Sequence, residues 1–327
     1  EVIPSLFEPA GNETPVPFED APDTVHCAPL GWPGIREAMG RIAGWFAQAD
    51  PALMVCDVSA ELAQLCRICS VPHVAVLQHG RRTDPGHKAA YDGAIGLLAA
   101  CSERLAQPDW TSRMRAKTFF AAGLGARLPP ADRAQARRRL GLDDDAEVIL
   151  AIAGEGGSGI TSAPLAVGAR ALSQSVWIAA GRFQRDWHAT EPSNLLFPGW
   201  VENVADHLMA ADVIISTAGN TVCHQILQAG KPWLVVPQWR YFDEQRLKAR
   251  AVQKAGAGVA LAQLPSCAAS WRAALASAKS RHDPQKQTQL IDKASERKAA
   301  AWLEDLALRV SRPSRSAETA DAIEIST

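Results

Sequence analysis

The stretch from Asp212 to Gln245 carries the arrangement of residues that most directly suggests chemistry. Asp212 to Ser216 is typical of a short buried strand, because three branched apolar residues stand in a row. The next four residues, from Thr217 to Asn220, predict a tight turn in which Gly219 allows a positive φ and Asn220 can cap the helix expected over Thr221 to Ala229. A strand, a turn of small residues and a helix N-terminus together make an anion site. We therefore expect a phosphate there, although an ordinary βαβ unit would have the same pattern.

A glycine-rich run from Gly154 to Gly159 follows a second buried strand, expected over Glu147 to Ala153. Glycines let the backbone approach a phosphate closely and supply N–H donors. The spacing also satisfies G-x-G-x-x-G, the pattern of dinucleotide-binding folds. Those folds place an acidic residue at the end of the next strand to hold the ribose. Here the next strand, Ser175 to Ala180, ends in Gly181-Arg182, so the dinucleotide interpretation lacks its acid.

His79 and the aspartates at 143–145 are further candidates for chemistry. His79 lies in the loop after a strand expected over His73 to Leu77, where open α/β sheets place their ligands. A solvated polar loop explains it equally well. The aspartates could hold a metal, but they lie in a turn with no other ligand group nearby, and the arginines at 133–139 are expected on a solvated helix face. We expect no metal site.

The composition is that of a soluble globular protein without a nucleic-acid partner. The 327 residues are 47% hydrophobic and 21% charged, and the net charge is −1. No apolar run approaches the ~18–20 residues that a transmembrane helix needs. Of the seven cysteines, Cys66 and Cys69 share the buried face of one helix, and the odd total argues against a disulfide framework. A reducing cytoplasm is the expected location.

Strands and helices alternate along the whole chain, which predicts an α/β fold with mainly parallel sheets between helices. Further strands are expected over Leu53–Cys56, Ile95–Ala100, Thr118–Ala121, Asn194–Pro198, Pro232–Pro237 and Val259–Leu261. One further helix is expected to begin after Ser59, which would be its N-cap. Other helices are expected over Ile35–Ala49, Asn203–Ala210, Leu247–Ala255, Trp271–Lys279 and Ile291–Arg309. We expect domains over residues 1–122 and 147–310, a linker with one short helix over 123–146, and a disordered tail over 311–327.

From Gly154 onward the order of features resembles the carboxyl-terminal domain of GT-B glycosyltransferases, especially the family 28 type of peptidoglycan synthesis and the UDP-dependent enzymes. The residues that carry this resemblance are the run Gly154–Gly159, Gly199-Trp200-Val201, Ala211–Thr221, Ala229–Pro232, Pro237, and Asp243-Glu244-Gln245 ahead of Ala249 and Gly256. Residues 51–121 resemble, less specifically, the second half of such an enzyme's acceptor domain. The resemblance implies two Rossmann-like domains facing across a cleft, the N-terminal one lacking its first strand, loop and helix.

The resemblance also implies a UDP-sugar held mainly by the carboxyl-terminal domain, and it assigns roles to particular residues. The backbone at Trp200 and Val201 would meet uracil, and Gln225 would hold the ribose in place of the family's glutamate. Glu244 and Gln245 would bind hydroxyls of the donor sugar. The residues implied for the diphosphate are Gly156, Gly157, Ser158, Thr217, Gly219, Asn220 and Thr221. Thr217 stands where relatives often have histidine or arginine, which weakens one phosphate contact.

The implied reaction transfers a sugar from the UDP-sugar to an acceptor hydroxyl, with inversion and without a metal or any cofactor beyond the donor. A general base would deprotonate the acceptor, while helix N-termini and loop amides stabilise the leaving diphosphate. Relatives often carry this base as a histidine in a glycine-rich loop near the N-terminus, and nothing before Leu53 offers such a unit. We expect that part of the domain upstream of Glu1, with His79 as the candidate inside this chain. The acceptor is not specified, and peripheral contact with a membrane is compatible with the sequence.

Three other functions stay open. A nucleotide-sugar hydrolase or epimerase would share the donor site but admit water. An NADP-dependent oxidoreductase would use Gly154 to Gly159 with Arg182 at the 2′-phosphate. A nucleotide-sugar-binding protein without catalysis would follow if the base is absent.

Overall fold

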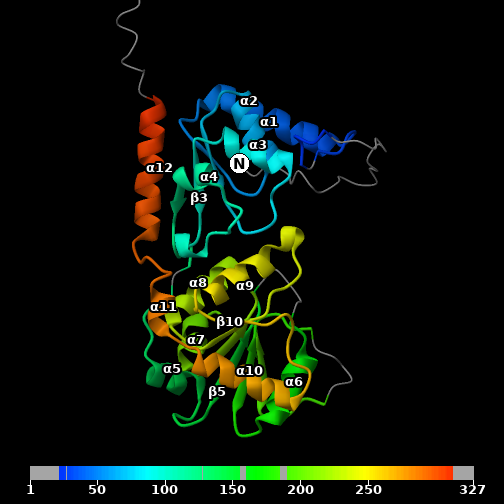
Figure 1. The fold of residues 1–327 in the computed structure, drawn as a ribbon, viewed down its shortest axis with the longest axis vertical. Coiled ribbons are helices and arrows are strands. Elements are labelled where there is room, and N and C mark those ends of the chain that lie inside the picture. Colours follow the sequence, from blue (N-terminus) through cyan, green and yellow to red (C-terminus); the bar gives the residue numbers. More distant parts are fainter. Residues whose placement is uncertain (1–21, 27, 127, 155–159, 185–189, 312–327) are drawn as a thin grey trace, which may run out of the picture. The chain divides into compact units, whose positions relative to one another are not determined.

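The computed structural model describes residues 22–26, 28–126, 128–154, 160–184 and 190–311 (Figure 1). By packing, this described chain divides into two compact units. The first contains residues up to Val76, Thr83–Leu97 and residues from Arg297; the second contains Leu77–Arg82 and Leu98–Glu296. These limits interleave along the sequence and differ from the expected domain limits at residues 122 and 147, which remain a prediction. None of the described helices is long and apolar enough to cross a membrane.

The first unit contains short parallel strands with helices between them. Its elements are α1 (Pro33–Ala49), β1 (Met54–Cys56), α2 (Ala60–Ile68), β2 (His73–Val76), α3 (Pro85–Gly93) and the first half of β3 (Gly96–Ala99), whose second half is grouped with the second unit. β1 and β2 pair in parallel and begin a four-stranded sheet of order β1-β2-β3-β4, in which β4 is Thr118–Phe120. The strands expected here are confirmed, but the sequence did not suggest α3, which begins at a proline after its Asp84 cap.

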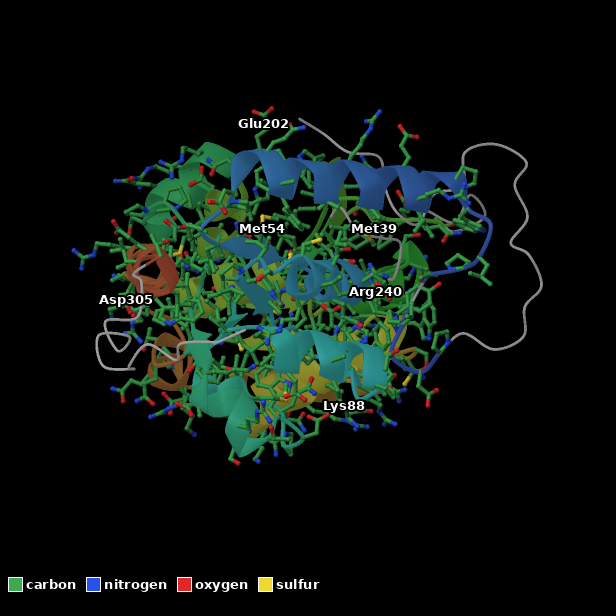
Figure 2. The ribbon with its side chains drawn as sticks, turned by 90° about the horizontal axis from the view of Figure 1, so that it is seen from above. Met39, Met54, Lys88, Glu202, Arg240 and Asp305 are labelled. Atoms are coloured by element: carbon green, nitrogen blue, oxygen red, sulfur yellow. The ribbon has the colours of Figure 1, made fainter. Side chains whose placement is uncertain are left out.

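Local contacts explain why α2 forms and which face it buries. Ser59 Oγ accepts a hydrogen bond from the Leu62 N–H at 3.1 Å, which confirms the expected cap. Cys66 lies in the core of this unit, and half-buried Cys69 and Met54 pack against that core. Met54 is labelled in Figure 2. Cys66 Sγ is 3.7 Å from Cys56 Sγ, and both are free thiols. The interpretation of the CxxC pair as packing residues is confirmed.

The last helix, α12 (Ser295–Ser311), packs from Arg297 onward with the first unit. A Cβ atom on Gly96 would lie 2.8 Å from the ring of Trp302, so the helix can approach β3 this closely only because residue 96 is glycine. The predicted tail after this helix lies outside the described residues.

The second unit is built on a six-stranded parallel sheet of order β10-β9-β8-β5-β6-β7. Its strands are β5 (Val148–Ile152), β6 (Val176–Ala180), β7 (Leu195–Gly199), β8 (Val213–Ser216), β9 (Trp233–Val235) and β10 (Val259–Ala260). Its helices are α4 (Ser112–Ala116), α5 (Arg133–Leu140), α6 (Ser162–Ala171), α7 (Val204–Ala210), α8 (Asn220–Ala229), α9 (Glu244–Lys254), α10 (Ala268–Ser280) and α11 (Pro284–Thr288), with single 3₁₀ turns η1 (Glu103–Leu105) and η2 (Tyr241–Asp243). From β5 the chain adds β6 and β7 on one side, then crosses to add β8, β9 and β10 on the other. The strand order therefore reverses between β5 and β8.

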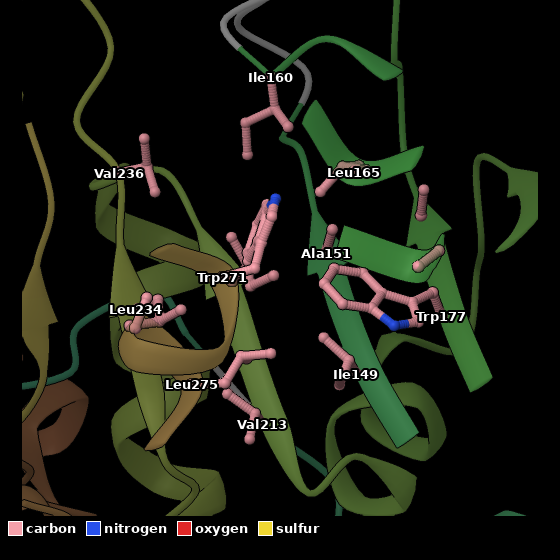
Figure 3. Close-up of a cluster of buried hydrophobic side chains, with 14 of the residues drawn as sticks. Ile149, Ala151, Ile160, Leu165, Trp177, Val213, Leu234, Val236, Trp271 and Leu275 are labelled. Carbon is pink, nitrogen blue, oxygen red and sulfur yellow. The ribbon is translucent and has the colours of Figure 1, made fainter. Parts of the chain in front are cut away.

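The core of the second unit lies between the sheet and helices α6 and α10 (Figure 3). Trp177 of β6 and Trp271 of α10 meet edge to face, with ring centroids 5.1 Å apart. Trp271 Nε1 donates a hydrogen bond to the Pro164 carbonyl of α6 at 2.9 Å. A Cβ atom on Gly168 would lie 2.5 Å from the Trp177 ring, so glycine lets α6 lie directly on that ring.

The segment expected as a linker contains α5, whose residue Arg137 forms an ion pair with Asp212. The Arg137 side chain is fully buried, and its Nη2 lies 2.7 Å from Asp212 Oδ2. It also donates to the carbonyls of Asp143 and Asp144, at 2.9 and 2.7 Å. The expectation of a solvated arginine face is therefore wrong for Arg137, because Nε, Nη1 and Nη2 all donate to groups inside the unit. Asp143 and Asp144 accept these hydrogen bonds through their backbone carbonyls, not through their carboxylates.

Candidate functional site

The carboxyl ends of β5 and β8 lie side by side in the second unit. Ile152 of β5 is the register partner of Ser216 of β8. The segments that follow, beginning at Gly154 and at Thr217, therefore leave the sheet together at the point where the strand order reverses. Open α/β sheets bind ligands at such a switch point.

Helix α8 begins at this point without a side-chain cap. Gly219 is the N-cap residue, with φ −65°, and within the described chain no side chain bonds to the first N–H groups of the helix. The expectations of a positive φ at Gly219 and of Asn220 as the cap are wrong: Asn220 is already helical, and its Oδ1 accepts a hydrogen bond from Lys248 Nζ. The first N–H groups of an α-helix have no partner within the helix. This end of α8 can therefore offer them, with the positive end of the helix dipole, to an anion.

The turn between β8 and α8 is fixed by buried hydrogen bonds. Ser216 Oγ accepts from Trp233 Nε1 at 2.9 Å and donates to the Thr217 carbonyl at 2.8 Å. Gln245 Oε1 accepts from the N–H groups of Ala218 and Gln238, at 3.1 and 2.9 Å. The turn is held in place by the protein itself, which suits a site that must be preorganised.

Those residues predicted for the diphosphate that the structure describes lie at this turn. Thr217 is buried and Gly219 half-buried, whereas Asn220 and Thr221 are exposed on the first turn of α8. A Cβ atom on Gly154 would lie 4.0 Å from Val222 Cγ2, so Gly154 lies close to the same helix turn. Gly156, Gly157 and Ser158 lie outside the described residues, and their phosphate role remains a prediction.

The residues predicted for uracil and ribose lie at the same edge of the sheet. Trp200 and Val201 follow β7, which ends at Gly199 with φ +76°. Trp200 is 58% exposed, and Val201 is half-buried. Gln225 is half-buried on α8, one turn after Thr221. Their contacts with a nucleoside remain predictions.

The residues predicted for the donor sugar begin α9 after a strained loop. Phe242 and Asp243 both have a positive φ, a conformation that clusters at ligand-binding sites. Glu244 Oε2 lies 3.6 Å from Arg82 Nη2, and the Arg82 guanidinium lies 4.6 Å from the centroid of the Phe242 ring. Because the Gln245 carbonyl oxygen already accepts two backbone bonds, its NH₂ group is what it can offer a sugar.

His79 is buried in the second unit. Its Nε2 donates a hydrogen bond to the Leu105 carbonyl at 2.8 Å, and its ring packs 5.5 Å from that of Trp110. Burial, and next the positive charge of Lys248, lower the pKa of His79 to about 3. A neutral imidazole of such low basicity does not suit the predicted role of general base.

Sequence reasoning missed Lys248, whose side chain is only 4% exposed. Its ammonium donates to Asn220 Oδ1 at the start of α8. The signal was present, since Gln245, Lys248, Ala249 and Val252 have the spacing of one buried helix face. A lysine in such a stripe rarely lies there without a polar partner.

Among the described residues, His26, Asp84 and His87 of the first unit have potential metal-ligand atoms within 4.8 Å of one another. Asp84 caps α3: its Oδ1 accepts the His87 N–H at 3.0 Å, and its Oδ2 accepts from His87 Nδ1 at 2.7 Å. Helix capping accounts for this grouping, and we assign it no metal.

A cavity of about 680 Å³ lies against the other end of α8, at Leu227 and Gln228. Prolines 129 and 130 and several residues between Thr288 and Glu296 also line it. It contains none of the predicted site residues, so it is a feature separate from the switch point.

Comparison with known sequences finds a family model that matches part of the chain and relatives of low identity. Residues 183–302 match the family model described as the glycosyltransferase family 28 C-terminal domain. Two curated relatives carry the name UDP-N-acetylglucosamine–N-acetylmuramyl-(pentapeptide) pyrophosphoryl-undecaprenol N-acetylglucosamine transferase. The one from Clostridioides difficile is 27% identical over 38% of this chain and 33% of its own length, and the one from Moorella thermoacetica is 27% identical over 60% and 56%. The chain thus spans between a third and somewhat over half of these relatives.

Solved structures extend the likeness to most of the chain. The glycosyltransferase of kitacinnamycin covers 82% of this chain and 79% of its own, with a TM-score of 0.59 at 18% identity. MurG from Acinetobacter baumannii covers 83% and 78%, with a TM-score of 0.55 at 15% identity. The fold is GT-B. The spinosyn rhamnosyltransferase SpnG, solved with thymidine diphosphate, is a further GT-B relative in fold, covering 84% and 74% with a TM-score of 0.53 at 17% identity.

The GT-B fold agrees with the predicted fold class, and the family match agrees with the predicted resemblance. The matched residues contain β8, α8 and α9, which supply the turn, the uncapped helix end and the buried Gln245. The family match therefore includes the β8 side of the switch point, while β5 lies outside it.

Proposed function

We propose that this protein transfers a sugar from a nucleotide sugar, with UDP as the expected nucleotide, to an acceptor hydroxyl. The observation that supports it is the uncapped N-terminus of α8 at the β5–β8 switch point, within the residues that match the family 28 domain. Such a helix end suits the diphosphate of the donor.

The leaving group departs as a nucleoside diphosphate, and negative charge grows on its phosphate oxygen as the sugar–oxygen bond breaks. N–H groups at the start of α8, with the glycine run after β5, would stabilise this charge electrostatically. We therefore propose a reaction that uses no metal. Attack by the acceptor from the opposite face of the sugar gives inversion, and the base that takes the acceptor's proton remains to be found.

The sugar would lie near the start of α9. Glu244 has a carboxylate that can accept from sugar hydroxyls, although Arg82 competes for it at 3.6 Å. Gln245 would donate through its side-chain NH₂ group while its oxygen holds the turn. The sugar, the acceptor and a cytoplasmic location remain predictions.

The donor panel for the test follows from the comparisons. One neighbour in fold was solved with thymidine diphosphate, so TDP is the second nucleotide to test. The oxidoreductase alternative predicts NADP binding instead, with Arg182, which follows β6, at the 2′-phosphate. Hydrolase, epimerase and non-catalytic functions would share the donor site.

The deciding experiment titrates the chain calorimetrically with UDP, TDP, NADP and a panel of UDP-hexoses. We expect UDP to bind and at least one UDP-hexose to bind more tightly than UDP. Glu244→Gln should weaken binding of the UDP-hexose and leave the affinity for UDP unchanged, because Glu244 would contact only the sugar. The difference in affinity between the two ligands should therefore become smaller. Binding of NADP without UDP or TDP, or no preference for any hexose, would overturn the proposal. Release of UDP only when an acceptor alcohol is present would distinguish transfer from hydrolysis.

A further inference from the structure

Lys248 lies on the buried face of α9, and among the described residues its charge has no anionic partner. The side chain is 4% exposed, and its ammonium donates to Asn220 Oδ1, a neutral acceptor. In the part of the chain that the structure describes, no carboxylate lies within ion-pair distance of it. The neighbouring acids are already engaged, Asp243 with Arg81 and Arg246, and Glu244 with Arg82.

Four titratable groups interact electrostatically with Lys248, and none of them carries a negative charge that could compensate its ammonium. Burial, and next Lys248 itself, lower the pKa of His79 to about 3 and that of His224 to about 4, so both rings are neutral near pH 7. Burial raises the pKa of Cys101 to about 12 and that of Cys223 to about 11, so both are neutral thiols. The nearest polarised backbone is the N-terminus of α8, which is itself positive.

Such a position is unfavourable for the protein alone. Removing an ammonium from water costs several kcal/mol unless a counter-charge and further hydrogen bonds replace the water. Lys248 gains one neutral acceptor and lies next to a positive helix end. A fold built only for stability would place an apolar side chain there.

We propose that Lys248 is a binding residue for the diphosphate of the nucleotide sugar, completing with the α8 N-terminus and Asn220 a site for a doubly charged anion. The identity of the ligand as a nucleotide sugar rests on the proposed function. The contacts of Lys248 by themselves indicate only that the ligand is an anion. An ammonium has three donors. One proton can remain on Asn220 Oδ1 while the others bind phosphate oxygens, so the existing contact aims the ammonium at the first turn of α8.

Variants at position 248 test this role against a matched control. Lys248→Met keeps the buried stem and removes the charge, Lys248→Arg keeps the charge, and Lys254→Met removes an exposed lysine from the same helix. Inorganic pyrophosphate, UDP and uridine are titrated into each protein. We expect Lys248→Met to weaken pyrophosphate and UDP by about tenfold to a hundredfold, the loss of one charge-assisted bond. Lys248→Arg should retain part of the affinity, and Lys254→Met should retain all of it.

Melting temperatures of the same variants show whether Lys248 acts on a ligand or on the fold. Without ligand, Lys248→Met should melt at the same temperature as the parent or above it, because a buried uncompensated charge has been removed. Pyrophosphate should raise the parent's melting temperature and leave that of Lys248→Met nearly unchanged. A lower melting temperature for ligand-free Lys248→Met, with unchanged pyrophosphate affinity, would overturn the role and make Lys248 a structural residue.

The two proposals fail in different ways. If pyrophosphate binding depends on Lys248 but neither UDP nor any UDP-hexose binds, the anion site stands and the glycosyltransferase proposal falls. If UDP-hexoses bind the parent and Lys248→Met equally well, the proposed function stands and the role of Lys248 falls.

Discussion

The side-chain oxygen of Gln245 accepts a hydrogen bond from the backbone N–H of Ala218 at 3.1 Å, across 27 residues of sequence. The same oxygen accepts from the Gln238 N–H at 2.9 Å. One buried amide thus ties the turn after β8 to the loop after β9, the two segments that approach the proposed donor.

Gln245→Leu should destabilise the protein because it leaves two buried N–H groups without an acceptor. Each costs about 1–3 kcal/mol, which urea unfolding can measure. Gln253→Leu is the control: on the same helix, Gln253 Oε1 accepts the Ala260 N–H at 2.9 Å, but at an exposed site where water can replace it. Equal losses in the two variants would show that burial of the acceptor does not matter.

Substitutions at Gly219 and Asn220 should weaken UDP binding while the fold survives. At Gly219 a Cβ atom would lie 4.0 Å from Thr217 Oγ1 and φ is −65°, so the protein itself has room for a side chain. Gly219→Val therefore intrudes mainly on the ligand, and we expect at least a tenfold loss. Asn220→Ala should lose less than Gly219→Val, since it removes one hydrogen bond to a charged group, worth ~1.5–3 kcal/mol. Calorimetric titration with UDP measures the affinity of each variant. Affinity equal to that of the parent in both variants would show that the diphosphate does not bind at this turn.

Gln225→Glu should tighten UDP binding if residue 225 holds the ribose. A carboxylate makes stronger hydrogen bonds to hydroxyls than an amide does, by roughly a factor of two in energy. Gln253→Glu adds the same charge at an exposed place on α9 and should leave affinity unchanged. Weaker binding in Gln225→Glu alone would mean that this side chain faces a phosphate, and no change would place it away from the ligand.

Arg137→Met should be among the most destabilising substitutions on α5. It removes hydrogen bonds to four backbone carbonyls and the buried one of the two arginine partners of Asp212. Removing a buried partner of an ion pair usually costs about 3–5 kcal/mol. Arg138→Met changes an exposed residue of the same helix and should stay within about 0.5 kcal/mol of the parent. Chemical denaturation of the two variants gives the comparison, and similar midpoints would contradict the buried role of Arg137.

Acidification should remove the stabilisation that Asp212 supplies. Burial by itself would raise the pKa of Asp212, but the Val148 N–H and the Arg133 and Arg137 side chains bring it below the ordinary value of 3.8. The folded pKa is lower than the unfolded one, so the contribution is complete above about pH 4 and is lost as the pH falls through the folded pKa. Unfolding free energies measured from pH 6 to pH 2 should therefore decline less steeply in Asp212→Asn than in the parent. Parallel profiles would contradict this linkage.

Much of the fold could be predicted because strands and helices follow local patterns. The strands near residues 148–152, 213–216 and 233–235 are short apolar runs, and Gly230 ends α8 as its position suggested. Short helices without strong patterns, such as α3 and α11, were not expected, and the boundaries of α9 and α12 moved by several residues. Asn220 was expected as a cap, since the composition of the turn could not distinguish a capping asparagine from a helical one bound to Lys248.

The sequence by itself determined the order of the elements and the presence of a strand, small-residue turn and helix suited to a phosphate. It could do so because these features depend on neighbouring residues. The tertiary structure decided the strand order, and with it the meeting of β5 and β8 at a switch point. It also decided which polar groups are buried: Gln245 joins residues 27 positions away, and Lys248 joins Asn220 across 28. Contacts of that separation depend on how the crossovers pack the helices, and no local pattern of hydrophobicity encodes them.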